Sequence, residues 1–238
     1  MKISLIIPMY NEDKIINDTL STVSAYMKER FFEDYEVIFV NDGSRDSCKD
    51  AVLACADPAV RLVSYEENHG KGYAIRKGVE AALGDVIMFT DCDLAYGTEV
   101  IGEFYGTLAT GDCDIAVGSR PKHPDGYAGY TFLRKLVSRT YLFVLRLFGG
   151  LSLSDSQCGC KGFRKDAAKK IFSYCEIDRF AFDFEAILIG QRIGAVFTEI
   201  PVTVKNHGES KVHVIRDTLR MLSDLRRMKK RIKKLDIS

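Results

Sequence analysis

The chain has 238 residues, a formal net charge of +1 and seven cysteines. This length suffices for one large domain with a substantial core, and the ordinary apolar and charged contents exclude a disordered chain. No stretch reaches the roughly 18–20 apolar residues of a membrane-spanning helix. The N-terminus enters an apolar strand without the basic segment of a signal peptide, and an odd number of scattered cysteines is typical of reduced thiols. We therefore expect a cytoplasmic protein.

Apolar and amphipathic segments alternate through the first half of the chain. Strands are expected at 3–8, 36–40, 60–64, 86–90 and 114–117, and helices at about 13–30, 51–56, 72–83 and 98–108. The alternation predicts an α/β fold with a mostly parallel sheet flanked by helices. Because the crossovers are right-handed, the carboxyl ends of the strands should gather at one edge of the sheet.

The second half is less regular. Helices are expected at 132–148, 166–172, 182–192 and 213–235, and strands at 162–164 and 196–200. The last helix carries an apolar stripe between basic flanks: ten Lys and Arg against three acids lie from Lys211 to Ser238. A basic amphipathic helix can lie in the interface of an anionic membrane. Packing of the stripe on the core or on a second subunit is the alternative, for this helix and for 132–148.

Two carboxylates, Asp91 and Asp93, end the apolar strand at 86–90. Side chains at i and i+2 of an extended segment point the same way, and adjacent carboxylates repel each other unless a cation lies between them. The pair therefore suggests a divalent metal that holds a diphosphate. A short acidic pair that caps a helix is the plainer alternative.

Polar residues follow the other strands as well. Tyr10 offers a ring face to a base or ribose, Glu12 an acceptor for ribose hydroxyls, and Asp42 an acceptor for a nucleobase edge. Lys71 lies between two glycines that allow close backbone approach to a ligand, at a helix N-terminus that favours an anion. Ordinary turn chemistry explains each segment taken alone. Their convergence at one edge, without a glycine-rich phosphate loop, favours a nucleotide site.

In their order, these motifs resemble those of family 2 glycosyltransferases with the GT-A (Rossmann-like) fold. The matching segments are Pro8-Met-Tyr-Asn-Glu12, Asn41-Asp-Gly-Ser44, His69-Gly-Lys-Gly72, Asp91/Asp93 and Gly118-Ser-Arg120. Two further segments, 155–164 and 180–185, are similar to the polyprenyl-phosphate branch, which includes dolichyl-phosphate glucosyltransferases and mannose synthases. Ala95 stands where the mannose synthases usually carry a Gln metal contact, which favours the glucosyl branch.

The resemblance implies a role for each matching position. The nucleoside would be held by Pro8, Tyr10, Glu12 and Asp42, with Lys71 near the donor. Asp91 and Asp93 would bind Mg²⁺ or Mn²⁺ on the diphosphate. The acceptor phosphate would be gripped by Arg120, Arg134 and Lys211. Asp155 and Gln157 would lie near the reacting centre with Asp93, Asp155 either as a base or as an orienting group.

The expected reaction is inverting transfer of a hexose from a nucleotide sugar to a polyprenyl phosphate, undecaprenyl or dolichyl phosphate. UDP-glucose is favoured as donor, and GDP-mannose is an alternative. Residues 1–212 would form the GT-A domain, with a nucleotide-sugar half (1–119) and an acceptor half (120–212), followed by the basic helix at 213–238. The protein would lie peripherally at the cytoplasmic face of the membrane.

Other functions fit the sequence less well. A family 2 transferase acting on a cell-surface glycan or a teichoic-type polymer would share the same motifs. A sugar-nucleotide pyrophosphorylase would carry a glycine-rich basic segment after the first strand, and a nucleic-acid-binding protein would interleave its basic residues with aromatic ones. Retention of both Asp91 and Asp93 argues against a non-catalytic sensor of sugar nucleotides.

Overall fold

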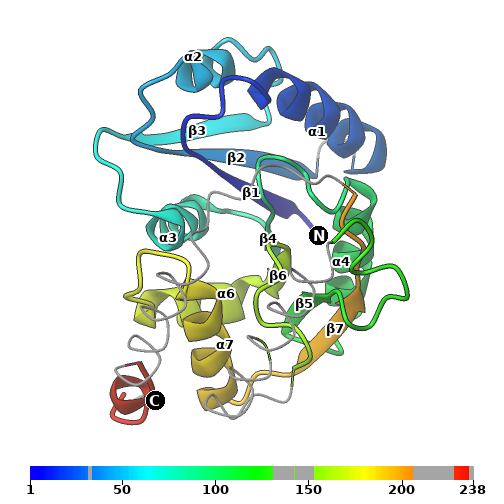
Figure 1. Ribbon diagram of the computed structural model, residues 1–238, viewed down its shortest axis with the longest axis vertical. Helices are drawn as coiled ribbons and strands as arrows, with labels where there is room; N and C mark the ends of the chain where they lie inside the picture. The colour runs from blue at the N-terminus through cyan, green and yellow to red at the C-terminus, as the bar shows by residue number, and fades with distance from the viewer. Residues whose placement is uncertain (32–33, 131–141, 143–152, 206–227, 236–238) are drawn as a thin grey trace.

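The computed structural model describes residues 1–31, 34–130, 142, 153–205 and 228–235. A seven-stranded sheet forms the centre, with strand order β3-β2-β1-β4-β6-β5-β7 (Figure 1). The strands are β1 (Ile3–Met9), β2 (Tyr35–Asp42), β3 (Val60–Tyr65), β4 (Val86–Phe89), β5 (Ile115–Ser119), β6 (Lys161–Arg164) and β7 (Phe197–Pro201). All neighbouring strands are parallel except that β6 runs antiparallel to both β4 and β5. The expected mostly parallel sheet is confirmed.

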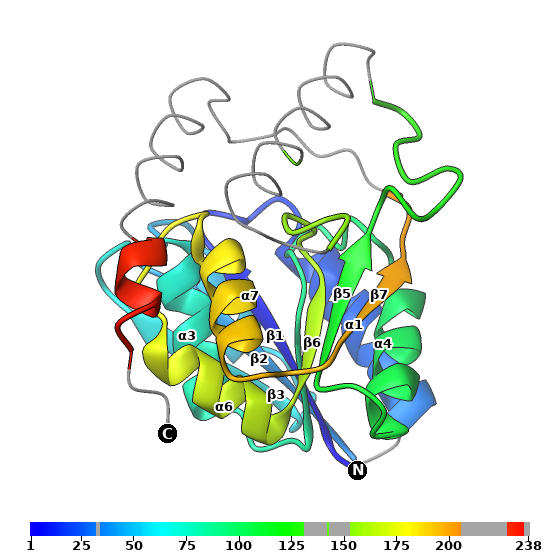
Figure 2. The same cartoon turned by 90° about the horizontal axis from the view of Figure 1, so that it is seen from below.

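Helices cover both faces of this sheet (Figure 2). One core lies under α1 (Ile16–Phe31), α2 (Cys48–Leu53) and α4 (Glu99–Ala109). The other lies under α3 (Lys71–Ala81), α6 (Lys165–Tyr174) and α7 (Phe182–Arg192). The central strands β1, β2 and β4 are apolar along almost their whole length because side chains on both of their faces are buried.

The chain end packs on the second core. Residues 228–232 are helical, and Met228 and Ile232 are buried beside α7. Arg231 pairs with the fully buried Glu185 of α7 and donates to the carbonyl of Tyr174 at 2.9 Å. The apolar side chains of Met228 and Ile232 therefore do not face a membrane: they pack on protein, which removes them from water.

The structure describes only part of the two expected amphipathic helices. The expected helix at 132–148 lies outside the described residues except for Leu142, and so does 213–227 of the final helix. In the described parts of the chain, no helix combines the length and apolar composition needed to cross a membrane.

Candidate active site

Hydrogen bonds join the loops after β1 and β2 at the carboxyl edge of the sheet. The amide of Asn11 donates to Ser44 Oγ at 3.1 Å, and the amide of Arg45 donates to Asn11 Oδ1 at 2.9 Å. Asn11 has a φ of 53°, a conformation that Asn tolerates better than most residues. This turn leaves Tyr10 39% exposed, with Glu12 and Pro8 partly buried beside it. The three proposed nucleoside contacts of this loop thus lie together on a braced turn.

Asp42 organises the loop that leads into α3. Its buried carboxylate accepts hydrogen bonds from Asn68 Nδ2 at 2.8 Å, from the His69 amide at 2.9 Å and from the Gly70 amide at 2.8 Å. These contacts show a structural task for Asp42 that its position at the end of β2 alone did not predict. Its carboxylate fixes the backbone directly before Lys71.

The glycines that flank Lys71 make room for another part of the same chain. A Cβ atom on Gly70 would lie 2.7 Å from the carbonyl oxygen of Asp178, and one on Gly72 would lie 2.3 Å from that of Ile177. The observed close approach of the turn between α6 and α7 gives these glycines a packing role beside the expected approach to a ligand, which stays a prediction. This contact joins the donor-side loop to the second half of the chain.

Lys71 and Asp91 form an ion pair at the centre of this edge. Burial alone would lower the pKa of Lys71, but the carboxylates of Asp91, Asp183 and Asp93 raise it, so its ammonium stays charged. Asp93 lies partly buried, and its Oδ1 accepts a hydrogen bond from the Ala95 amide at 3.0 Å. Burial and the neighbouring Asp91 raise the pKa of Asp93. Asp91 and Asp93 therefore place negative charge close together, and the Lys71 ammonium neutralises part of it.

The chemistry of these acids fits a hard divalent cation. Two carboxylates one residue apart supply the oxygen ligands that Mg²⁺ and Mn²⁺ prefer. Among the residues that the structure describes, no group of three or more His, Cys, Asp or Glu side chains is placed to hold a metal. Asp91 and Asp93 would thus supply only part of a coordination shell, and diphosphate oxygens and water would have to complete it. Such incomplete protein ligation is usual for Mg²⁺ at phosphate sites.

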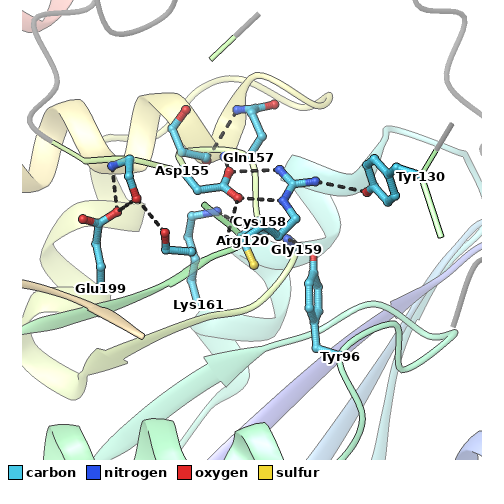
Figure 3. A network of polar contacts seen from close by, with 12 residues as sticks. Tyr96, Arg120, Tyr130, Asp155, Gln157, Cys158, Gly159, Lys161 and Glu199 are labelled. Carbon is cyan, nitrogen blue, oxygen red and sulfur yellow. Dashed lines mark hydrogen bonds and ion pairs between the residues drawn. The ribbon is translucent and has the colours of Figure 1, made fainter. Parts of the chain in front are cut away.

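A second buried ion pair joins Arg120 to Asp155, two residues expected on the acceptor side (Figure 3). Arg120 directly follows β5, and it donates from Nε and Nη2 to the two oxygens of Asp155 at 2.6 and 2.9 Å. The amide of Gln157 donates to Asp155 Oδ1 at 3.0 Å, and Arg120 Nη1 to the Tyr130 hydroxyl at 3.4 Å. Burial would raise the pKa of Asp155, but Arg120 lowers it overall.

Further contacts hold the segment that carries Asp155. Glu199 of β7 accepts hydrogen bonds from the amide and hydroxyl of Ser154, at 2.7 and 2.5 Å. It also pairs with Lys122 at 3.0 Å. At the other end of the segment, the Gly159 amide donates to the Tyr96 hydroxyl at 3.3 Å (Figure 3). The position of Asp155 is thus set from β7 and from the loop after β4.

The structure adds a buried pair that sequence reasoning missed, Lys161 with Asp183. Lys161 Nζ donates to the Cys158 carbonyl and to Asp183 Oδ1, both at 2.7 Å, and lies 5.7 Å from the centre of the Phe89 ring. The available signal was a lysine directly before the short strand expected at 162–164. The carboxylate of Asp183, at the start of α7, also raises the pKa of Lys71. The groups expected at the metal and those expected at the acceptor therefore belong to one charged region.

Arg134 and Lys211, the other two expected contacts to the acceptor phosphate, lie outside the described residues. The described candidates come together at the carboxyl edge as the sequence predicted. The groups expected on the donor side lie at the ends of β1 and β2 or directly after β1, β3 and β4. The Arg120–Asp155 pair joins the end of β5 to the segment before β6.

Known proteins are similar to this chain in sequence and in architecture. Residues 4–172 match the family described as glycosyl transferase family 2. Glycosyltransferase AglD of Haloferax volcanii is 32% identical over 231 residues, which cover 95% of this chain and 37% of AglD. Dolichyl-phosphate beta-glucosyltransferase ALG5C of Trichomonas vaginalis is 33% identical over 226 residues, which cover 89% of this chain and 66% of ALG5C. The chain thus spans only part of the length of each relative.

A solved structure supports the fold assignment. Glucosyl-3-phosphoglycerate synthase from Mycobacterium tuberculosis, in complex with Mn²⁺, UDP and glucosyl-3-phosphoglycerate, matches with a TM-score of 0.70 and 20% identity. The match covers 94% of this chain and 79% of the synthase. The expected GT-A fold is confirmed. Since the family match also covers more than half of its length, the chain belongs to glycosyl transferase family 2.

Proposed function

We propose that the protein transfers glucose from UDP-glucose to the phosphate of a polyprenyl lipid such as dolichyl phosphate, with inversion at the anomeric carbon. The observation that carries this proposal is the placement of two charged pairs at one edge of the sheet. Lys71 and Asp91 suit a nucleotide diphosphate, and Arg120 with Asp155 suits an anionic acceptor. The names of relatives such as ALG5C, and the UDP bound to the structural neighbour, support a UDP-glucose donor and a lipid-phosphate acceptor.

On the donor side, the nucleoside would lie on the turn of Pro8, Tyr10 and Glu12, beside the loop that Asp42 fixes. A Mg²⁺ or Mn²⁺ ion held by Asp91 and Asp93 would neutralise charge on the diphosphate leaving group. The ammonium of Lys71 pairs with Asp91 and can also donate to diphosphate oxygens. These contacts stabilise the charge that develops as the glycosidic bond breaks.

On the acceptor side, no general base is needed. A lipid phosphate is already an anion at neutral pH, so one of its oxygens can attack the anomeric carbon directly. Asp155 accepts three hydrogen bonds from Arg120 and one from the Gln157 amide, and its pKa is lowered. Asp155 therefore fits the role of positioning Arg120 better than that of removing a proton. Correct placement of two reactants can supply much of the rate acceleration.

The acceptor also suggests where the protein works. Polyprenyl phosphates reside in membranes, so we place the enzyme peripherally at the cytoplasmic face. The excess of basic residues between Lys211 and Ser238 supports attraction to an anionic surface. Residues 228–232 would take part through their basic side chains, because Met228 and Ile232 are buried in the core.

Release of UDP tests the proposal. The purified protein would be incubated with Mg²⁺ or Mn²⁺, UDP-glucose or GDP-mannose, and dolichyl phosphate, undecaprenyl phosphate or unphosphorylated dolichol. We expect release from UDP-glucose that requires the lipid phosphate and is lost in Asp93→Ala. Asp112→Ala, in an exposed turn before β5 at the opposite edge, is the matched control and should retain activity. Transfer that is indifferent to lipid phosphate would refute this acceptor and favour a glycan.

A further inference from the structure

Lys71 lies within an alternating series of buried or partly buried charges. Its ammonium pairs with Asp91, and both Asp93 and Asp183 lie close enough to raise its pKa. Asp183 is held in turn by Lys161, whose side chain is completely buried. Lys71 thus has the carboxylates of Asp91 and Asp93 on the side of the proposed metal site and that of Asp183 on the side of α7.

The same carboxylate cannot serve a lysine and a divalent ion equally well. The ammonium directly contacts Asp91 Oδ1, and the proposed ion would coordinate this carboxylate. Two cations so close together repel each other strongly in a partly desolvated site. A metal at Asp91 and Asp93 must therefore either displace Lys71 or bind despite the repulsion from its positive charge.

A donor diphosphate changes this balance. Its oxygens are acceptors for an ammonium group, so a displaced Lys71 would gain a new anionic partner. Asp183 remains beside Lys71 from the α7 side, where Lys161 fixes it. In the absence of the diphosphate, Lys71 stays at Asp91 and partly neutralises the crowded acids.

We propose that Lys71 is an internal counter-cation of the metal site, which it occupies until the nucleotide diphosphate arrives together with the metal. This inference rests on the proposed function, since it assumes the metal site at Asp91 and Asp93. It adds that metal and nucleotide bind cooperatively and that Lys71 is the residue that couples them. Free metal therefore binds weakly, and the metal–nucleotide pair binds well.

Titration with Mn²⁺, followed by electron paramagnetic resonance of the free ion, measures the coupling without any turnover. In Lys71→Met, we expect the Kd for Mn²⁺ alone to fall about tenfold and the Kd for UDP with Mn²⁺ to rise about tenfold, so that the coupling largely disappears. Lys71→Arg keeps the positive charge and should not tighten binding of Mn²⁺ alone. Lys77→Met removes a lysine from the same helix that pairs with Glu80 instead, and should leave both constants unchanged.

The outcomes separate this inference from the function on which it rests. If Mn²⁺ with UDP binds to the wild type no better than to Asp93→Ala, the proposed metal site is refuted and the coupling with it. If binding depends on Asp93 but Lys71→Met leaves the Kd for Mn²⁺ alone unchanged or raises it, only the counter-cation role is refuted. Circular dichroism establishes that each variant is folded before the constants are compared.

Discussion

The absence of a side chain at Gly159 leaves room for the Asp91 carboxylate. A Cβ atom at Gly159 would lie 2.1 Å from Asp91 Oδ2 and 3.0 Å from its Cγ. The backbone at Gly159 cannot easily move away. Its amide donates to the Tyr96 hydroxyl, and β6, which begins two residues later, pairs with both β4 and β5. In Gly159→Ala, the carboxylate of Asp91 must therefore rotate out of its present place.

The expected effect is a loss of metal affinity. Displacing one of the two proposed carboxylate ligands should weaken binding of Mn²⁺ with UDP by about 10–100-fold, comparable to the loss of a partner that orients a metal ligand. This range corresponds to about 1.4–2.8 kcal/mol of binding free energy. Isothermal titration calorimetry of Mn²⁺ in the presence of UDP measures it, and turnover of UDP-glucose should fall with it.

Gly106→Ala in α4 is the control, because an added Cβ meets nothing within 4 Å. It should leave metal affinity unchanged and stabilise the helix by up to about 1 kcal/mol. A folded Gly159→Ala protein that binds Mn²⁺ and UDP as the wild type does would show that Asp91 need not keep its observed position. The predicted dependence of metal binding on this carboxylate position would then be refuted.

Three further predictions concern the buried ion pairs. Lys161→Met leaves Asp183 buried without its cation and should lower the free energy of unfolding by about 3–5 kcal/mol, measured by urea denaturation. Asp155→Asn should destabilise most at neutral pH, because Arg120 lowers the folded-state pKa of Asp155. That stabilisation is present above the unfolded pKa of about 4 and is lost as pH falls through the lower folded pKa, so urea curves of variant and wild type should converge in acid. Arg231→Met removes the cation beside a buried glutamate of α7 and should lower the free energy of unfolding by about 1–3 kcal/mol, measured by thermal unfolding.

Each of these predictions can be contradicted directly. Unchanged urea denaturation of Lys161→Met would show that Asp183 is stabilised without its lysine. A difference between Asp155→Asn and wild type that does not shrink in acid would show that the Asp155 charge adds nothing to stability. Thermal unfolding of Arg231→Met at the wild-type temperature would mean that the chain end does not depend on its ion pair. Lys230→Met, an exposed neighbour, is the control for that variant.

Much of the fold and of the donor side follows from local sequence. Apolar runs of strand length that alternate with amphipathic segments predict the order of β1 to β5 and of the helices between them, because burial on two faces leaves a continuous apolar pattern. Since parallel strands gather their carboxyl ends, the sequence alone also places Asp42, Lys71 and Asp91 at one edge of the sheet.

Tertiary structure decided the partners of these charges. Arg120 and Asp155 are 35 residues apart, Lys161 and Asp183 are 22 apart, and no local pattern links either pair. The antiparallel insertion of β6 between β4 and β5 brings Lys161 next to the end of β4. The sequence by itself determined which segments are buried, because hydrophobic periodicity is local. Only the folded chain determined which buried charges meet, because neutralising them takes groups that are distant in sequence and adjacent in space.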